Sequence, residues 1–315
     1  MLLREMLDLF ALLDTPRACG ADIERLLVES GADDVRVTTL SGERGTTDSV
    51  RVLVKGSDGK SSGGDAPTLG IIGRLGGLGA RPAAIGFTSD GDGALAALTA
   101  ALKLVRMHAA GDVIAGDVIV ATHVCPDAPT LEHDPVPFMD SPITMRQCNE
   151  AEVDERMDAI LSIDTTKGNR VINLNGVAIS NTIKDGYILE ASNDLLDVLT
   201  RVTGKLPAVF PCSQQDITPY GNGLHHLNSI LQPAVVTDAP VVGVAITTEQ
   251  MVAGCATGAS HAEDVETAAR FACEVAKGFG AGKVSFYDEA QYARLRALYG
   301  DMRRFQTAGA DATRA

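Results

Sequence analysis

Six acidic and histidine residues have side chains of the types that bind divalent metals. They are Asp90, Asp92, His123, Asp127, Asp164 and His261. Carboxylates and imidazoles at strand ends and in loops are the ligands that a zinc-class ion takes in proteins. The alternative is structural, because an aspartate before a helix, such as Asp90, is also a typical helix cap. A single histidine, such as His123 or His261, is also commonly a hydrogen-bonded structural residue. The residue types alone leave both roles open.

Apolar segments lead into several of these residues. Segments 68–72, 84–88, 117–122 and 157–163 are predicted to be buried strands, and each runs into a polar residue. Those residues are Arg74, Asp90, His123 and Asp164. Strands that are apolar throughout and alternate with Ala/Leu-rich helices predict three α/β/α layers with a mixed, mostly parallel sheet. Ligands of open α/β sheets bind at the carboxyl ends of the strands, so we expect one site at that edge.

Other segments have simpler signatures. An amphipathic helix opens the chain, and alternating apolar residues at 35–37 and 50–54 predict a β-hairpin. Residues 55–67 are rich in Gly and Ser and are predicted to form a mobile connection. A helix is expected over residues 223–231. No break in composition divides the chain, which predicts a single domain over 1–300 and a flexible tail over 301–315.

The composition excludes some classes of partner. The net charge of −14 argues against binding to nucleic acid or to an anionic membrane, because both need a basic surface. No apolar run reaches the ~20 residues that span a bilayer. Charged residues interrupt the N-terminal segment, so we do not expect it to be a signal peptide. The six cysteines include no CxxC pair and are predicted to be reduced. We therefore expect a cytoplasmic protein.

The order of these segments resembles the superfamily of zinc-dependent co-catalytic exopeptidases, which includes aminopeptidases and aminoacylases. SDGDGALAALTAAL is similar to the segment with the bridging aspartate, here Asp90. MDAILSIDTT resembles the strand that presents a further carboxylate, Asp164, and GCATGASH resembles the loop with the ligand His261. The chain also resembles, more closely, an uncharacterised bacterial family of unknown function. The resemblance implies the α/β/α fold and a divalent metal, zinc or manganese, bound by Asp90, Asp164 and His261.

Two parts of the superfamily's metal site are missing. Where its members have His-x-Asp, residues 74–76 are Arg-Leu-Gly. Arginine stays protonated and has no lone pair to donate, so Arg74 cannot bind a metal. The paired glutamates expected after the strand at 117–122 are also missing. In their place stand His123, Cys125 and Asp127.

Two hypotheses for the site follow, and they are compatible. In the first, one metal is held by Asp90, His261 and either His123 or Asp127, and the spare group is the general base for a bound water. In the second, Arg74 replaces a metal as the positive charge. It then either pairs with a carboxylate, Asp164, or binds a carboxylate of the substrate.

These hypotheses predict hydrolysis of an amide bond in a small peptide or an acylated amino acid. His123 and Asp127 are the candidate bases, with Arg74 as an anchor for substrate. The candidates for further substrate contacts are His225, His226 and Asn222. The competing hypothesis is a non-catalytic small-ligand-binding or regulatory protein that kept the scaffold after losing the metals.

Three weaker hypotheses concern other segments. Cys255 and His261 share a loop, which suggests a cysteine hydrolase with Cys255 as the nucleophile and His261 as the base. Such a pair must lie within hydrogen-bond reach. The long Pro-rich loop that contains residues 133–135 is predicted to cover the site. Finally, the resembled proteins commonly assemble, which predicts a homo-oligomer.

Overall fold

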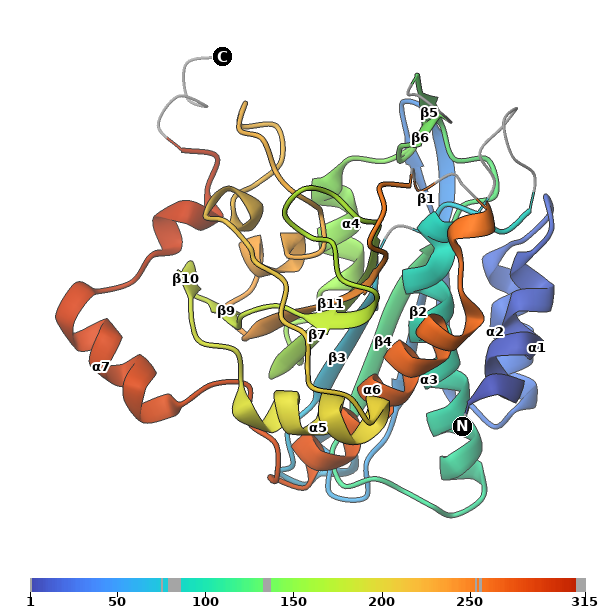
Figure 1. Cartoon of the computed structure of the whole chain (residues 1–315). Helices are drawn as coiled ribbons and strands as arrows, with labels where there is room; N and C mark the ends of the chain where they lie inside the picture. The colour runs from blue at the N-terminus through green and yellow to red at the C-terminus, as the bar shows by residue number, and fades with distance from the viewer. Residues whose placement is uncertain are drawn as a thin grey trace.

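The structure is a computed structural model that describes residues 2–74, 76–78, 86–132, 137–252, 254 and 257–309. Within these residues, nine strands form one mixed sheet in the order β1-β2-β4-β3-β7-β11-β9-β10, with β8 also paired to β11 (Figure 1). Four parallel strands make its centre: β4 (Val118–Val124), β3 (Leu69–Gly73), β7 (Ala159–Thr166) and β11 (Val241–Thr247).

Antiparallel strands flank this centre on both sides. On one side lies the hairpin of β1 (Asp34–Gly42) and β2 (Gly45–Val54), as predicted. On the other lie β8 (Gly176–Ile179), β9 (Ile183–Lys184) and β10 (Tyr187–Ile188). A separate pair of short strands consists of β5 (Thr130–Leu131) and β6 (Phe138–Met139).

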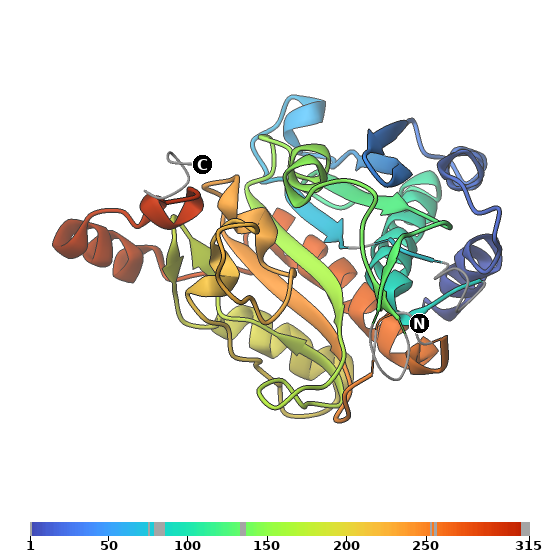
Figure 2. The same ribbon diagram turned by 90° about the horizontal axis from the view of Figure 1, so that it is seen from above.

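Helices cover both faces of the sheet and complete the predicted three layers (Figures 1 and 2). One face carries α3 (Asp92–Ala109), α5 (Asn193–Thr203) and α6 (Ala262–Gly280), with α1 (Leu3–Leu13) packed outside α3 and α6. On the same side of the molecule, α2 (Gly20–Glu29) packs on the hairpin. The other face carries α4 (Met145–Glu152) and the 3-10 helix η4 (Gln232–Val235).

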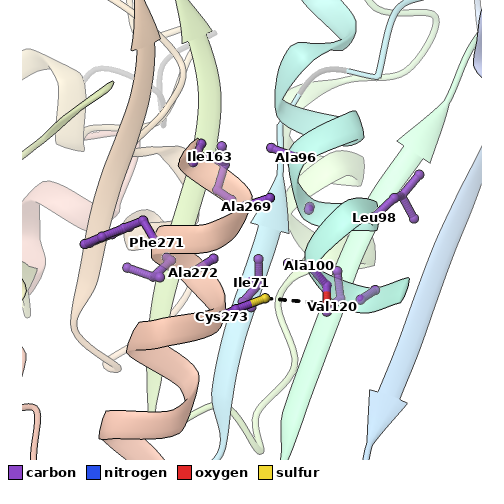
Figure 3. Close-up of a cluster of buried hydrophobic side chains, with 14 of the residues drawn as sticks. Ile71, Ala96, Leu98, Ala100, Val120, Ile163, Ala269, Phe271, Ala272 and Cys273 are labelled. Atoms are coloured by element: carbon purple, nitrogen blue, oxygen red, sulfur yellow. Dashed lines mark hydrogen bonds between the residues drawn. The ribbon is translucent and has the colours of Figure 1, made fainter. Parts of the chain in front are cut away.

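The larger core lies between the sheet and the pair α3 and α6. Ile71, Val120 and Ile163 point from the central strands toward small residues of both helices, including Ala100 and Cys273 (Figure 3). The Cys273 thiol lies 3.8 Å from the Ala100 carbonyl oxygen and donates to it. Alanine and cysteine at these positions let the helices approach each other and the strands closely, which explains a core with few aromatic residues.

Two local predictions are wrong. No helix forms over 223–231, because this part of the chain is held in an irregular loop by buried groups: Asp216 accepts a hydrogen bond of 2.6 Å from the Leu227 backbone. The segment 55–67 is not a free connection, because the buried Asp117 accepts hydrogen bonds of 2.8 Å from the backbones of Gly56 and Ser61. Of the strand expected at 84–88, residues 84–85 lie outside the described residues, and residues 86–88 belong to no strand.

The C-terminal part of the chain runs through α7 (Glu289–Tyr299) and the 3-10 helix η6 (Arg303–Gln306). Gln306 donates to the carbonyl oxygens of Ala234 and Thr237, at 3.0 and 2.9 Å. The beginning of the predicted tail is therefore attached to the domain. The described helices include none that is both long enough and apolar enough to cross a bilayer.

Candidate functional site

Three aspartates gather at the carboxyl edge of the central strands, and we call them the carboxylate cluster: Asp90, Asp92 and Asp164. Asp90 lies in the 3-10 helix η2 (Ser89–Gly91), Asp92 is the first residue of α3, and Asp164 lies near the end of β7. The start of α3 sits directly on the strand ends, because a Cβ at Gly93 would be 2.5 Å from the Ile163 carbonyl oxygen. All three carboxyls are buried.

Arg74 follows β3 and is fully buried. Its guanidinium forms an ion pair with Glu152 of α4, donates to Asn149 Oδ1 at 3.1 Å and contacts the Met145 sulfur. Burial opposes the charge, but Glu152, Cys148 and Asp164 raise the pKa of Arg74, so the cation is retained. Because the guanidinium is inaccessible and committed to α4, the prediction that Arg74 anchors a substrate carboxylate finds no support in this geometry.

His123 belongs to the same buried network. Its Nε2 accepts a hydrogen bond of 2.9 Å from the Gly76 backbone, while Nδ1 lies 3.3 Å from Glu152 Oε1. A ring nitrogen that accepts from an N–H carries the lone pair, so Nδ1 is the nitrogen that donates to Glu152. The Nε2 lone pair is therefore occupied, and His123 is neither a free base nor a free metal ligand in this arrangement.

A second buried cation neutralises Asp92. Lys167 Nζ lies 3.0 Å from Asp92 Oδ2, and both side chains are almost wholly inaccessible. Ser260 donates a 2.6 Å hydrogen bond to Asp92 Oδ1. Burial raises the pKa of Asp92 to about 6, opposed by Lys167, Ser260 and the nearby His261. His261 itself is half exposed at the start of α6, with Nδ1 3.4 Å from Asp264.

The other two carboxyls of the cluster have no cation bonded to them within the described part of the chain. Burial raises the pKa of Asp164 to about 7, although Arg74 and a 3.0 Å hydrogen bond from Ser229 lower it. Asp164 Oδ1 is buried and has no hydrogen-bond partner among the described residues. Burial, together with Asp164 and Asp92, raises the pKa of Asp90 well above its usual range.

The loop after η3 (Gln215–Ile217) borders the cluster. Burial and the charge of Asp164 raise the pKa of Tyr220, so its phenol stays protonated. His226 stacks on Tyr220 at 4.3 Å, and its ring nitrogens contact the carbonyl oxygens of Thr218 and Leu224. Asn222 donates to the Thr218 hydroxyl at 2.9 Å.

His226 and Asn222 thus shape this loop, whereas His225 is exposed. Whether any of the three contacts substrate stays a prediction.

The described residues do not fit a metal centre of the expected kind. They contain no group of three or more His, Cys, Asp or Glu placed to hold an ion. Two buried cations already neutralise acids at this edge, Arg74 for Glu152 and Lys167 for Asp92, and Asp127 is exposed beside the Cys125 thiol rather than buried with Asp90. Of the carboxylate cluster, only Asp90 and Asp164 have no ion pair with a cation of the described chain. A dication bound here would therefore have only these two acids of the cluster as ligands.

Several partners in this site were not predicted. Glu152 and Asn149 come from α4, Lys167 follows β7, and Ser229 and Ser260 come from loops. Lys167 was the one with a usable signal, since a lysine just after a buried strand must find an acid. Nothing local marks Glu152 as the partner of Arg74. Cys255 and residues 133–135 lie outside the described residues, so the cysteine-hydrolase and covering-loop predictions stay untested.

The fold and this edge define a three-layer α/β protein with a buried, charge-compensated carboxylate cluster. Residues 38–309 match the model of the family described as "Protein of unknown function (DUF1177)", and the chain belongs to that family. No curated protein matches the chain in sequence.

Two solved structures are remotely similar. The bottromycin maturation enzyme BotP is 14% identical with a TM-score of 0.49, and the match covers 84% of this chain and 66% of that one. The LapA aminopeptidase of Legionella pneumophila is 12% identical with a TM-score of 0.45, covering 88% and 65%. This chain thus spans slightly less than two thirds of the length of each.

Proposed function

We propose that the chain is a small-ligand-binding protein whose ligand occupies a cavity between α1, α3 and α6, beside the carboxylate cluster. The observation that carries this proposal is a cavity of about 330 Å³ lined by residues of all three helices. Cavities of roughly 300–1,000 Å³ are the size that binds small organic molecules. The metal chemistry of the resembled exopeptidases is not required, which is consistent with the ion pairs that fill this edge.

The lining of the cavity indicates the class of ligand. Its walls are apolar, and include Leu7, Phe10 and Phe87, whose aromatic rings lie 5.2 Å apart. The polar residues of the lining are Ser260, the exposed Asp14, and Asp92, which Lys167 neutralises and Ser260 hydrogen-bonds. The described lining contains two carboxyls and no lysine, arginine or histidine. A compact apolar molecule with one ammonium or hydroxyl group fits this lining, and an anionic one does not.

The test is calorimetric titration with three probes of one shape: phenylethylamine, phenylethanol and phenylacetate. We expect the amine and the alcohol to bind and the acid not to. Leu7→Trp fills the mouth of the cavity and should abolish binding. Leu3→Trp is the matched control, because Leu3 is similarly exposed on the same helix (41% against 51% for Leu7) but does not line the cavity. Equal binding by both variants, or equal binding of phenylacetate, would contradict the proposal.

Amide hydrolysis is the second candidate. The observation that favours it is the pair of buried carboxyls, Asp90 and Asp164, which have raised pKa values at the edge where α/β proteins bind ligands. Metal content should be measured in protein purified without chelator and after loading with zinc or manganese, alongside Asp90→Ala and His261→Ala. One equivalent of metal that both variants lose, together with turnover of small amides, would support it. If the protein takes up no metal on loading and turns over no amide, the hydrolase hypothesis is excluded and ligand binding is the function that stands.

A further inference from the structure

The helix α7 differs from the other α-helices of the described chain because none of its residues is buried. It projects from the body of the molecule in both views (Figures 1 and 2). Its inner side is attached near the turn between β9 and β10, where Arg296 lies 2.9 Å from Asp185 and the Tyr292 hydroxyl also donates to Asp185. An isolated helix of 11 residues is marginal in water, so such a helix normally needs a packing partner.

The outer side of α7 carries apolar residues at helical spacing. Ala290, Ala293, Ala297 and Leu298 are exposed there, with Leu298 53% exposed, and Arg294 lies among them. Positions i, i+3, i+7 and i+8 share one face of a helix. The same chain therefore presents an uncovered apolar face that contains one cation.

A groove of about 700 Å³ lies near the base of this helix, at the amino ends of β7 and β11. Its apolar surface includes Val153, Met157 and the 45% exposed Val236. Its acidic residues outnumber its single lysine: Glu150, Glu155, Asp158 and Asp238 against Lys184. Three of these acids pair with Arg146, Lys60 and Arg303 of their own chain, and Glu155 is exposed without an ion pair among the described residues.

We propose that α7 of one copy of this chain docks in the groove of a second copy, and that the exchange is reciprocal. The apolar face of α7 meets Val153 and Val236, and Arg294 pairs with Glu155 of the partner subunit. A reciprocal exchange of this kind closes on itself with twofold symmetry, so it gives a dimer rather than a filament. Charge complementarity favours a second copy, because Glu155 of the groove and Arg294 of α7 carry opposite charges and neither has an ion pair among the described residues.

The experiment measures the mass of the full chain by sedimentation velocity over a range of concentrations. We expect a dimer in the wild type. Arg294→Glu and Glu155→Arg should each weaken dimerisation by about tenfold or more, since each places like charges opposite each other. An equimolar mixture of the two variants should restore dimers. In the mixed dimer, one contact brings the two reversed charges together, and the other contact keeps the wild-type pair.

Leu298→Glu and Val236→Glu should also weaken the dimer, and Leu206→Glu is the control because Leu206 is 91% exposed away from both surfaces. Circular dichroism of each variant is the check that it is folded. A monomer at every concentration would overturn the proposal, and so would a dimer that the Arg294 and Glu155 variants do not affect.

Discussion

The carboxyl edge of the sheet and the helix α7 differ in which side chains are buried and in whether those side chains have partners within the chain. At the edge, charges are buried and matched within the chain: Arg74 with Glu152 and Lys167 with Asp92. On the outer side of α7, apolar groups are exposed and have no packing partner within the described chain. A buried ion pair is intolerant of losing one partner, whereas an exposed helix face contributes little to folding until something covers it. The comparison separates residues that hold this fold together from residues available for recognition.

The largest expected effect comes from breaking the buried pair. Arg74→Met leaves Glu152 buried without its cation and should lower the free energy of unfolding by about 3–5 kcal/mol. The measurement is denaturant unfolding. Adding Glu152→Gln to this variant removes the stranded charge and should recover part of the loss. A single variant as stable as the wild type would mean that the edge does not depend on this pair.

A smaller effect, with a pH signature, is expected at Asp164. Its pKa is raised from 3.8 to about 7 in the folded protein, so the folded state binds the proton more tightly than the unfolded state. Stability is therefore favoured at low pH and lost as the pH rises from about 4 to about 7.

Asp164→Asn removes this loss and can still accept from Ser229. The variant should have a higher melting temperature than the wild type at pH 8, and the difference should shrink toward pH 5. Thermal unfolding across this range measures it. Ser229→Ala serves as a control that keeps the titrating carboxyl. A difference that is the same at both pH values would exclude this role for Asp164.

The smallest effect is expected in α7. Ala293→Gly costs about 1 kcal/mol in helix propensity, but in a monomer it should change global unfolding by less than about 0.5 kcal/mol, because α7 opens without the core. Hydrogen exchange should show fast exchange of α7 amides beside slow exchange in β3 and β7. If the α7 amides exchange as slowly as those of the central strands in dilute protein, α7 does not open independently of the core.

The sequence by itself determined the central strands β3, β4 and β7, the hairpin, and the convergence of Arg74, His123 and Asp164 on one edge. The reason is that uniformly apolar segments must be buried on both faces, and parallel strands end on the same side. It also excluded Arg74 as a metal ligand, since a guanidinium has no lone pair. These are properties of residue type and short-range pattern.

Only the tertiary structure decided what each group does at that edge. Glu152 reaches Arg74 from α4, far along the chain, and the Gly76 backbone takes the lone pair of His123. Residues 223–231 form a loop rather than a helix because the buried Asp216 holds their backbone. The exposure of α7 was also decided there, since it depends on which other parts of the chain pack against this helix. Partners that lie distant in sequence determine the charge and burial of a side chain, and no local pattern encodes them.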